Sequence, residues 1–192
     1  MTDHRSPLVL RSNEDAPGDA GERLAGVAQK LGRVPNMYRA MANSPGLLAT
    51  YLTGYDRFRT GSGLSPAEQE VVFLTISRFN ECEYCMAAHS FIAEVVSKTP
   101  PDVVAAIRED RAVDDDRMAA LIGMTRSLLE TSGHPTEADV HAFREVGFTD
   151  EQVLELVLAI SVKTISNWTN HLFGTEVDDV FSGHTWAVAQ RA

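Results

Sequence analysis

The sequence predicts an all-α protein, a single-domain helical bundle, and three observations support that prediction. From Glu22 onward the chain reads as one helix after another, several helix ends carry recognisable capping residues, and alternating apolar runs joined by Asn-Gly or Asp-Gly turns are nearly absent. A chain of 192 residues is long enough to bury a core of its own without staples. We therefore expect one helical domain.

The N-terminal segment differs from the rest in composition. Residues 1–20 are rich in Asp, Glu, Gly, Pro and Ser, and we expect them to form a flexible arm that precedes a helical domain over residues 21–192. No internal repeat is evident within that domain. The helices are expected near residues 21–32, 36–43, 45–60, 66–79, 82–97, 101–109, 115–131, 137–146 and 150–173.

Capping patterns support several of these boundaries. Ser65 stands before Pro66 and three residues before Glu68, which is the pattern of a capping box with proline at the first helical position. The run 147–152 combines a C-capping glycine with a Thr…Gln capping box. Thr136 is expected to cap a short helix, and the prolines at 100–101 separate two helices.

Composition and charge exclude several classes of function. The formal net charge is −10, and no cluster of Lys and Arg offers a basic face to phosphates, so we expect neither a nucleic acid nor an anionic membrane as partner. No apolar run approaches the roughly 20 residues that span a bilayer. The N-terminus lacks the apolar core of a signal peptide. A cytoplasmic location is therefore expected.

Two segments are apolar on nearly all sides. Residues 71–79 and 153–165 have no clear polar face. Helices of this kind lie inside a bundle or are covered by another subunit. Because a domain of this size has limited room for fully internal helices, we expect a homo-oligomer.

The strongest functional signal is a cysteine pair with two acid–base groups. Cys82 and Cys85 are the only cysteines of the chain and form a C-x-x-C motif, and His89 follows four residues after the second. In a reducing compartment such a pair is more often catalytic or metal-binding than structural. At spacings i, i+3 and i+7 the three side chains share one helix face, which directs His89 toward the cysteines. The start of a helix also favours a thiolate.

A carboxylate on the preceding helix completes the predicted site. Glu70 lies on the face of Phe73, Leu74 and Ser77, so it needs a polar partner, and His89 is the obvious one. We infer a peroxidase cycle in which Glu70 orients His89 and His89 helps to deprotonate Cys85. Cys85 then attacks a peroxide and becomes a sulfenic acid, Cys82 resolves it as a disulfide, and an external dithiol or thiol protein reduces the pair.

This arrangement resembles the alkylhydroperoxidase D branch of the carboxymuconolactone decarboxylase family. Its pattern is a Glu twelve residues before a C-x-x-C pair and a His four residues after it, matched here by Glu70, Cys82, Cys85 and His89. The resemblance also covers 31–36 through 91, the run 147–152 and the region 167–171, about two-thirds of the chain. It implies an all-α fold, a dimer, trimer or hexamer, and cysteine-based peroxidase activity. The decarboxylase branch lacks the cysteine pair.

One position departs from that pattern. The best-known peroxidase members have His directly before the second Cys, where this chain has Tyr84. If that His relays protons, the relay here is shorter or altered. Tyr84 is interpreted mainly as a packing residue and kept as a secondary candidate for the site. His171, near Asn167 and Asn170, is the other secondary candidate, although capping of a helix end is the simpler interpretation.

Other interpretations of the cysteine pair stay open at this point. The chain could be a dithiol–disulfide oxidoreductase without peroxide specificity, because a C-x-x-C pair at a helix start tunes redox potential in unrelated folds. It could also bind zinc through Cys82, Cys85 and His89 as a non-enzymatic protein, although a fourth ligand is not evident. Alternatively, the two thiols could be buried and inert. With no G-x-G-x-x-G or P-loop run, no cofactor is expected, and no metal is assigned.

Overall fold

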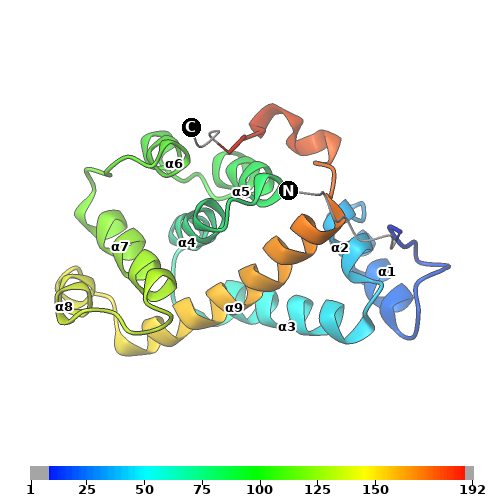
Figure 1. The fold of residues 1–192 in the computed structure, drawn as a ribbon, viewed down its shortest axis with the longest axis horizontal. Helices are drawn as coiled ribbons and strands as arrows, with labels where there is room; N and C mark the ends of the chain where they lie inside the picture. Colours follow the sequence, from blue (N-terminus) through cyan, green and yellow to red (C-terminus); the bar gives the residue numbers. More distant parts are fainter. Residues whose placement is uncertain (1–8, 189–192) are drawn as a thin grey trace.

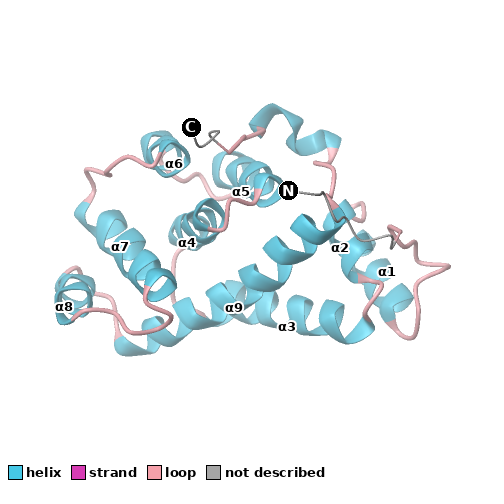
Figure 2. Cartoon of the chain, in the orientation of Figure 1, coloured by secondary structure: helices cyan, strands magenta, loops and turns pink. Residues whose placement is uncertain are grey.

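The computed structural model describes residues 9–188, which form α-helices joined by short loops (Figures 1 and 2). Every predicted helix is present within two residues of its expected ends, and the all-α prediction is confirmed. A short 3₁₀-helix, which the sequence did not indicate, follows the last α-helix. The elements are α1 Ala20–Leu31, α2 Asn36–Met41, α3 Pro45–Gly61, α4 Pro66–Phe79, α5 Glu83–Val95, α6 Pro101–Glu109, α7 Asp116–Glu130, α8 Glu137–Glu145, α9 Asp150–Phe173 and η1 Asp179–His184.

The predicted capping residues begin their helices as expected. Ser65 and Glu68 form a reciprocal capping box at the start of α4. Thr136 caps α8 and Thr149 caps α9, each with a partner three residues on. Gly147 has a φ of +88°, a conformation that favours glycine. These local bonds satisfy backbone N–H groups that have no partner within the helix, and so they fix where each helix begins.

Helix α4 lies at the centre of the bundle. It packs against α5, α6, α7 and α9, while α3 runs beside α9 along the lower edge of the view in Figure 1. Consistent with this position, every residue from Glu68 to Ser77 is buried. The apolar character of residues 71–77 is therefore explained within one chain, whereas Phe79 at the end of the segment is 42% exposed. At the α3–α9 crossing, a Cβ on Gly54 would lie 2.7 Å from Cγ2 of Val162, so the close approach requires glycine.

The apolar core has two parts that meet beside α4 and α5. One part gathers α4, α6, α7 and α8 around Phe73 and Leu121. The other gathers α1, α2 and the start of α3 around Tyr51, and it includes Cys82 and Cys85. The predicted site therefore lies at the junction between two packed clusters, where side chains are held from several directions.

Part of the predicted N-terminal arm lies outside the described residues. Residues 1–8 are in that part, whereas residues 9–19 lie against α2. The backbone N–H of Arg11 donates to the carbonyl of Arg39 at 3.0 Å, and Asn43 Nδ2 donates to the carbonyl of Val9 at 2.7 Å. The segment 9–19 is thus anchored by hydrogen bonds in the structure. The flexibility of the arm as a whole stays a prediction.

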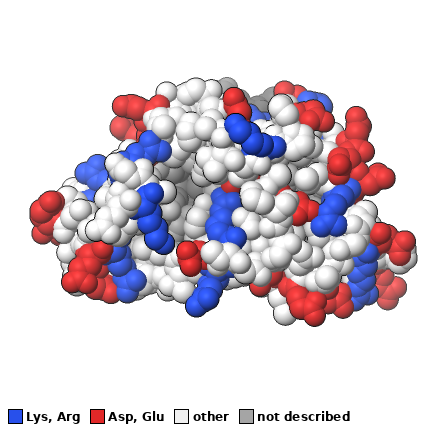
Figure 3. All heavy atoms as spheres, turned by 180° about the vertical axis from the view of Figure 1, so that it is seen from behind, with Lys and Arg blue, Asp and Glu red and all other residues white. Residues whose placement is uncertain are grey.

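The surface carries charges of both signs. On the face shown in Figure 3, Lys and Arg side chains are interspersed with Asp and Glu and do not form one continuous basic field. Among residues 9–188, no helix combines the length and the apolar character that crossing a membrane requires.

Candidate active site

The two cysteines lie at the start of α5 as free, buried thiols. Cys82 is the N-cap residue, one position before the helix rather than in its first turn as predicted, and Cys85 follows in the first turn. Cys82 has no exposed surface, and Cys85 is 1% exposed. The backbone N–H groups and the positive end of the α5 dipole therefore face both sulfur atoms in an environment from which bulk water is largely excluded.

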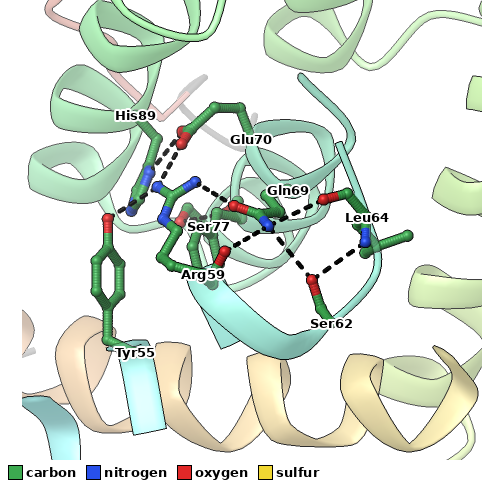
Figure 4. Close-up of polar contacts among 9 residues, drawn as sticks. Tyr55, Arg59, Ser62, Leu64, Gln69, Glu70, Ser77 and His89 are labelled. Carbon is green, nitrogen blue, oxygen red and sulfur yellow. Dashed lines mark hydrogen bonds and ion pairs between the residues drawn. The ribbon is translucent and has the colours of Figure 1, made fainter. Parts of the chain in front are cut away.

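Glu70 and His89 make the contact that the sequence predicted. Glu70 Oε2 lies 2.8 Å from His89 Nδ1, and both side chains are buried. The other carboxylate oxygen of Glu70 accepts a short hydrogen bond from Arg59 (Figure 4). Because Nδ1 is engaged by the carboxylate, Nε2 is the ring nitrogen left for chemistry.

Arg59 extends this network and was not identified from the sequence. Its guanidinium also donates to the hydroxyl of Tyr55 at 2.8 Å and to Gln69 at 3.2 Å (Figure 4). It stacks over the ring of Phe73. Arg59 and His89 thus hold different oxygens of the same carboxylate. Its position on α3 gave no sequence signal, because only the packing of α3 against α4 brings the two together.

Helix α9 presents a polar face to the cysteines. Asn170 Nδ2 lies 3.3 Å from Sγ of Cys85 and 3.8 Å from Sγ of Cys82, and the hydroxyl of Ser166 lies 3.9 Å from Sγ of Cys85. Lys163, one turn earlier on the same face, is completely buried. Asn170 therefore contacts the reactive sulfurs rather than only closing the helix, which was the simpler interpretation of the sequence.

The two thiols are expected to differ strongly in acidity. Burial by itself raises the pKa of Cys85, but the contact with Cys82 and the charge of Lys163 outweigh it, so the pKa lies well below the ordinary thiol value. The interaction with Cys85 and burial raise the pKa of Cys82. The surroundings of the pair thus favour ionisation of Cys85 and disfavour ionisation of Cys82.

The two acid–base groups, His89 and Glu70, differ in charge. Burial and the charge of Lys163 lower the pKa of His89 below 6.5, despite the opposing effect of Glu70. Burial disfavours the charge of Glu70, but His89 and Arg59 outweigh it and lower the pKa of Glu70 below 4.5. At neutral pH, the site thus contains a neutral imidazole next to a carboxylate.

Cys85 and His89 line a common cavity of about 240 Å³. Its wall is largely aromatic, with Tyr38, Tyr51 and Tyr55 on one side. Its rim includes Leu31 and Val96, which are 55% and 67% exposed. The face of α5 that carries Cys85 and His89 therefore leads to the mouth of this cavity at Val96, the residue that follows the helix.

Cys82 lines a different cavity of about 410 Å³. That cavity is bordered by Asn170 and by the exposed His171, the secondary candidate from the sequence. Tyr84 lies between the two cavities and lines both. The two thiols of the pair thus face different spaces.

The hydroxyl of Tyr84 is engaged in a structural contact. It donates to Asp178 Oδ2 at 2.5 Å, and Asp178 also accepts from the backbone N–H of Asn36 at the start of α2. The ring of Tyr84 meets Phe181 of η1 edge to face. Tyr84 therefore ties the C-terminal segment to α2 and α5, which supports its interpretation as a packing residue.

Within the part of the chain that the structure describes, no group of three or more His, Cys, Asp and Glu side chains is arranged to hold a metal ion. His89 directs Nδ1 to Glu70.

Comparison with known proteins gives a family match over part of the chain. Residues 45–127, which span α3 to most of α7, match the model of the carboxymuconolactone decarboxylase family. The resemblance inferred from Glu70, Cys82, Cys85 and His89 is thereby confirmed, and all four residues lie inside the matched segment. A comparison with curated protein sequences finds no match.

Solved structures with the same fold include peroxidase-related proteins. A peroxidase-related protein from Ralstonia eutropha JMP134 with an alkylhydroperoxidase AhpD core is 26% identical, with a TM-score of 0.78 over 91% of this chain and 93% of that one. A peroxidase-related protein from Silicibacter sp. TM1040 is 21% identical, with a TM-score of 0.76 over 96% of each chain. A cysteine-to-alanine variant of the debrominase Bmp8, in complex with 2,3,4-tribromopyrrole, is 16% identical, with a TM-score of 0.77 over 95% of this chain and 97% of that one. The last two similarities concern the fold alone.

Proposed function

We propose that this protein is a thiol-dependent hydroperoxidase in which Cys85 attacks the peroxide. The observation that carries the proposal is that Cys85 and His89 line one cavity while Glu70 holds Nδ1 of His89. Peroxide reduction needs a thiolate, a nearby group that transfers protons and a space for the substrate. The family region and the peroxidase-related relative support the same chemistry.

The first step oxidises Cys85 and cleaves the peroxide. The Cys85 thiolate attacks the outer oxygen of ROOH, and an S–O bond forms as the O–O bond breaks. His89 Nε2 takes the proton of that oxygen and passes it to the leaving alkoxide. The products are the alcohol ROH and a sulfenate on Cys85, which takes a proton from water to become the sulfenic acid. The neutral state of His89, which burial favours, suits it to accept a proton at neutral pH.

The second step uses Cys82. Its sulfur attacks the sulfenic sulfur of Cys85, a disulfide forms, and water leaves. The negative charge of Cys85, which raises the pKa of Cys82 in the resting site, is removed by oxidation. Cys82 therefore becomes a better nucleophile only after Cys85 has reacted. In this order, the disulfide between Cys82 and Cys85 forms only after the peroxide has been reduced.

The third step restores both thiols at the expense of an external dithiol. Because Cys82 lines its own cavity beside His171, we propose that the reductant, a small dithiol or a thiol protein, enters on that side. The reductant attacks Cys82, forms a mixed disulfide and leaves as its own disulfide. Substrate and reductant would then use separate entrances.

The shape of the cavity indicates the class of peroxide. The three tyrosines on its wall have pKa values raised by burial, so their phenols stay neutral, and the remaining wall is mainly apolar. A hydroperoxide with an aromatic or branched apolar group gains more from burial here than hydrogen peroxide does. We propose organic hydroperoxides as substrates.

The test is a thiol count on fully reduced protein before and after one equivalent of cumene hydroperoxide, with mass spectrometry. We expect both thiols to disappear in the parent protein and a trapped sulfenic acid on Cys85 in the Cys82→Ser variant. Cys85→Ser should abolish peroxide consumption. Thiols that survive every peroxide but oxidise readily with a disulfide reagent would contradict the proposal and favour the dithiol–disulfide oxidoreductase.

We also propose that the chain assembles with copies of itself through α9. Leu154, Val157, Trp168 and Leu172 lie at helical spacing on one face of α9, and Leu154, Trp168 and Leu172 are 70%, 62% and 59% exposed. Large exposed apolar side chains that share one face of a helix indicate an interaction surface. Sedimentation velocity should show an oligomer that Trp168→Glu dissociates. A monomeric parent protein at micromolar concentration would contradict the proposal.

A further inference from the structure

Lys163 is a buried cation for which no acidic side chain supplies a partner. It is one of three lysines in the chain and has no exposed surface. Its Nζ makes no hydrogen bond, and no ion pair joins it to a carboxylate among residues 9–188. Burial of an unpaired ammonium group is costly, so a group next to Lys163 should carry the compensating negative charge.

The surroundings of Lys163 place it on the cysteine side of α9. Ser166 and Asn170, one and two turns further on the same face, both lie against Cys85. Nζ of Lys163 lies 5.5 Å from the centre of the Phe73 ring, and that ring lies 4.9 Å from the imidazole of His89. The lysine thus belongs to the same buried layer as the attacking thiol and its base.

Arg59, the other buried cation near the site, already has a counter-ion. It binds Glu70, and Glu70 also binds His89, so this carboxylate is shared between two partners on the α3 and α5 sides. Next to the cysteines, α9 presents the hydroxyl of Ser166 and the amide of Asn170, whereas its acidic residues lie in its first two turns. Lys163 forms an ion pair with none of them among residues 9–188, so the cysteine pair is the remaining source of a balancing anion.

We propose that Lys163 is the counter-ion of the Cys85 thiolate and keeps this sulfur ionised in the resting protein. The inference rests on the proposed function, in which Cys85 is the attacking residue. Asn170 donates a hydrogen bond to the same sulfur, so α9 supplies both the charge and a donor. Burial raises the pKa of Cys85, but the contact with Cys82 and the charge of Lys163 lower it further than burial raises it. The lowered pKa agrees with this assignment.

The other ionisable groups near Cys85 do not replace Lys163 in this role. Burial and Lys163 lower the pKa of His89, which leaves the imidazole neutral, and burial raises the pKa values of the tyrosines, which leaves the phenols neutral. Glu70 is anionic and bound elsewhere. The titratable and charged groups that face Cys85, its histidine or their cavity are Arg33 from the α1–α2 loop, Tyr38 from α2, Tyr51, Tyr55 and Arg59 from α3, Glu70 from α4, Cys82, Tyr84 and His89 from the α5 segment, and Lys163 from α9. Arg33 lies over the ring of Phe181, 5.1 Å from its centre.

The first test is the pH dependence of alkylation of Cys85. In the Cys82→Ser background, the rate with iodoacetamide reports the thiolate fraction of a single thiol. Lys163→Met keeps the length and apolar stem of the side chain and removes its charge, and Lys30→Met is the matched control because that lysine side chain is 79% exposed. We expect Lys163→Met to raise the midpoint of the alkylation rate as a function of pH by at least one pH unit, which corresponds to a fall of about tenfold in the thiolate fraction at neutral pH. A midpoint equal to that of Lys30→Met would overturn the proposal.

The second test does not depend on the folding of a lysine variant. If the two groups form an ion pair, the coupling is reciprocal, and loss of the thiolate must lower the titration midpoint of Lys163. Three lysines allow assignment of Nζ resonances by nuclear magnetic resonance with ¹⁵N-labelled protein. In Cys85→Ser the midpoint of Lys163 should fall by at least one pH unit, and the resonance of Lys30 should not move. An unchanged Lys163 midpoint refutes the ion pair.

These measurements separate the inference from the function on which it rests. Neither uses a peroxide, so a normal Cys85–Lys163 coupling with no peroxide consumption would refute the hydroperoxidase and retain the ion pair. Rapid peroxide consumption with no coupling would refute the ion pair and retain the hydroperoxidase.

Discussion

The substitution Glu70→Gln tests whether the buried carboxylate organises the site. Glu70 has no exposed surface. One of its carboxylate oxygens accepts a hydrogen bond from Arg59, and the other contacts Nδ1 of His89. Glutamine has nearly the same shape, but its NH₂ group would face one of these donors, and the charge that balances Arg59 would be lost. The side chain of Arg59 is only 19% exposed, so solvent does not fully compensate.

The expected loss of stability follows from this burial. Removal of one partner from a buried ion pair costs about 3–5 kcal/mol, because the remaining charge is left without compensation. For a chain of this size, each kcal/mol corresponds to a shift in Tm of roughly 2–4 °C. We therefore expect thermal or urea unfolding to show a decrease in Tm of roughly 6–20 °C. Peroxide turnover should fall by about 10²-fold or more, because His89 is no longer held at Nδ1.

A matched exposed pair provides the control. Glu130 contacts Arg126 at 3.6 Å on the surface of α7, and both side chains are about half exposed. Glu130→Gln should change the free energy of unfolding by less than about 1 kcal/mol, because exposed pairs contribute little. If Glu70→Gln is as mild as Glu130→Gln, the carboxylate does not organise the site, and the mechanism built on His89 is wrong.

Three further predictions follow from contacts elsewhere in the structure. On acidification, the free energy of unfolding should fall first below pH 6.5, because His89 of the unfolded chain binds a proton that the folded protein does not bind. It should fall again below pH 4.5, where the same holds for Glu70, and each group contributes a slope of at most about 1.4 kcal/mol per pH unit. In urea titrations, His89→Asn should remove the first of these two phases. Gly54→Ala should destabilise the protein by about 1–3 kcal/mol, because the added Cβ would meet Val162. Gly123→Ala is the control: nothing lies within 4 Å of the added Cβ, so it should stabilise the protein by up to about 1 kcal/mol. Equal effects of the two substitutions in thermal unfolding would contradict the α3–α9 contact. Tyr84→Phe should lower the free energy of unfolding by about 1.5–3 kcal/mol, because the hydrogen bond to Asp178 is lost, and should leave peroxide turnover within a few-fold of the parent. A large loss of turnover at unchanged stability would assign Tyr84 a chemical role instead.

The helices and the core of the site could be predicted from the sequence because both depend on local spacing. Capping residues such as Ser65 and Thr149 act on backbone groups three residues away, so their pattern is visible in the chain. The same holds for Cys82, Cys85 and His89, whose spacing of three and four residues fixes one helix face whatever surrounds it. Glu70 was found because a carboxylate on an apolar face requires a partner, and His89 was the nearest group able to provide one.

The rest of the site depends on contacts between residues far apart in the chain. Arg59 reaches Glu70 because α3 packs on α4, and Lys163 and Asn170 reach Cys85 because α9 crosses the start of α5. Asn170 stands in a polar region that the sequence shows beside His171, but a buried lysine carries no pattern on its own helix that distinguishes it from a surface lysine. The sequence by itself determined which thiols and which base could react. Only the tertiary structure decided which charged and polar groups surround the two thiols, and these matter because the energy of a charge in a protein interior depends on the groups that the fold places around it.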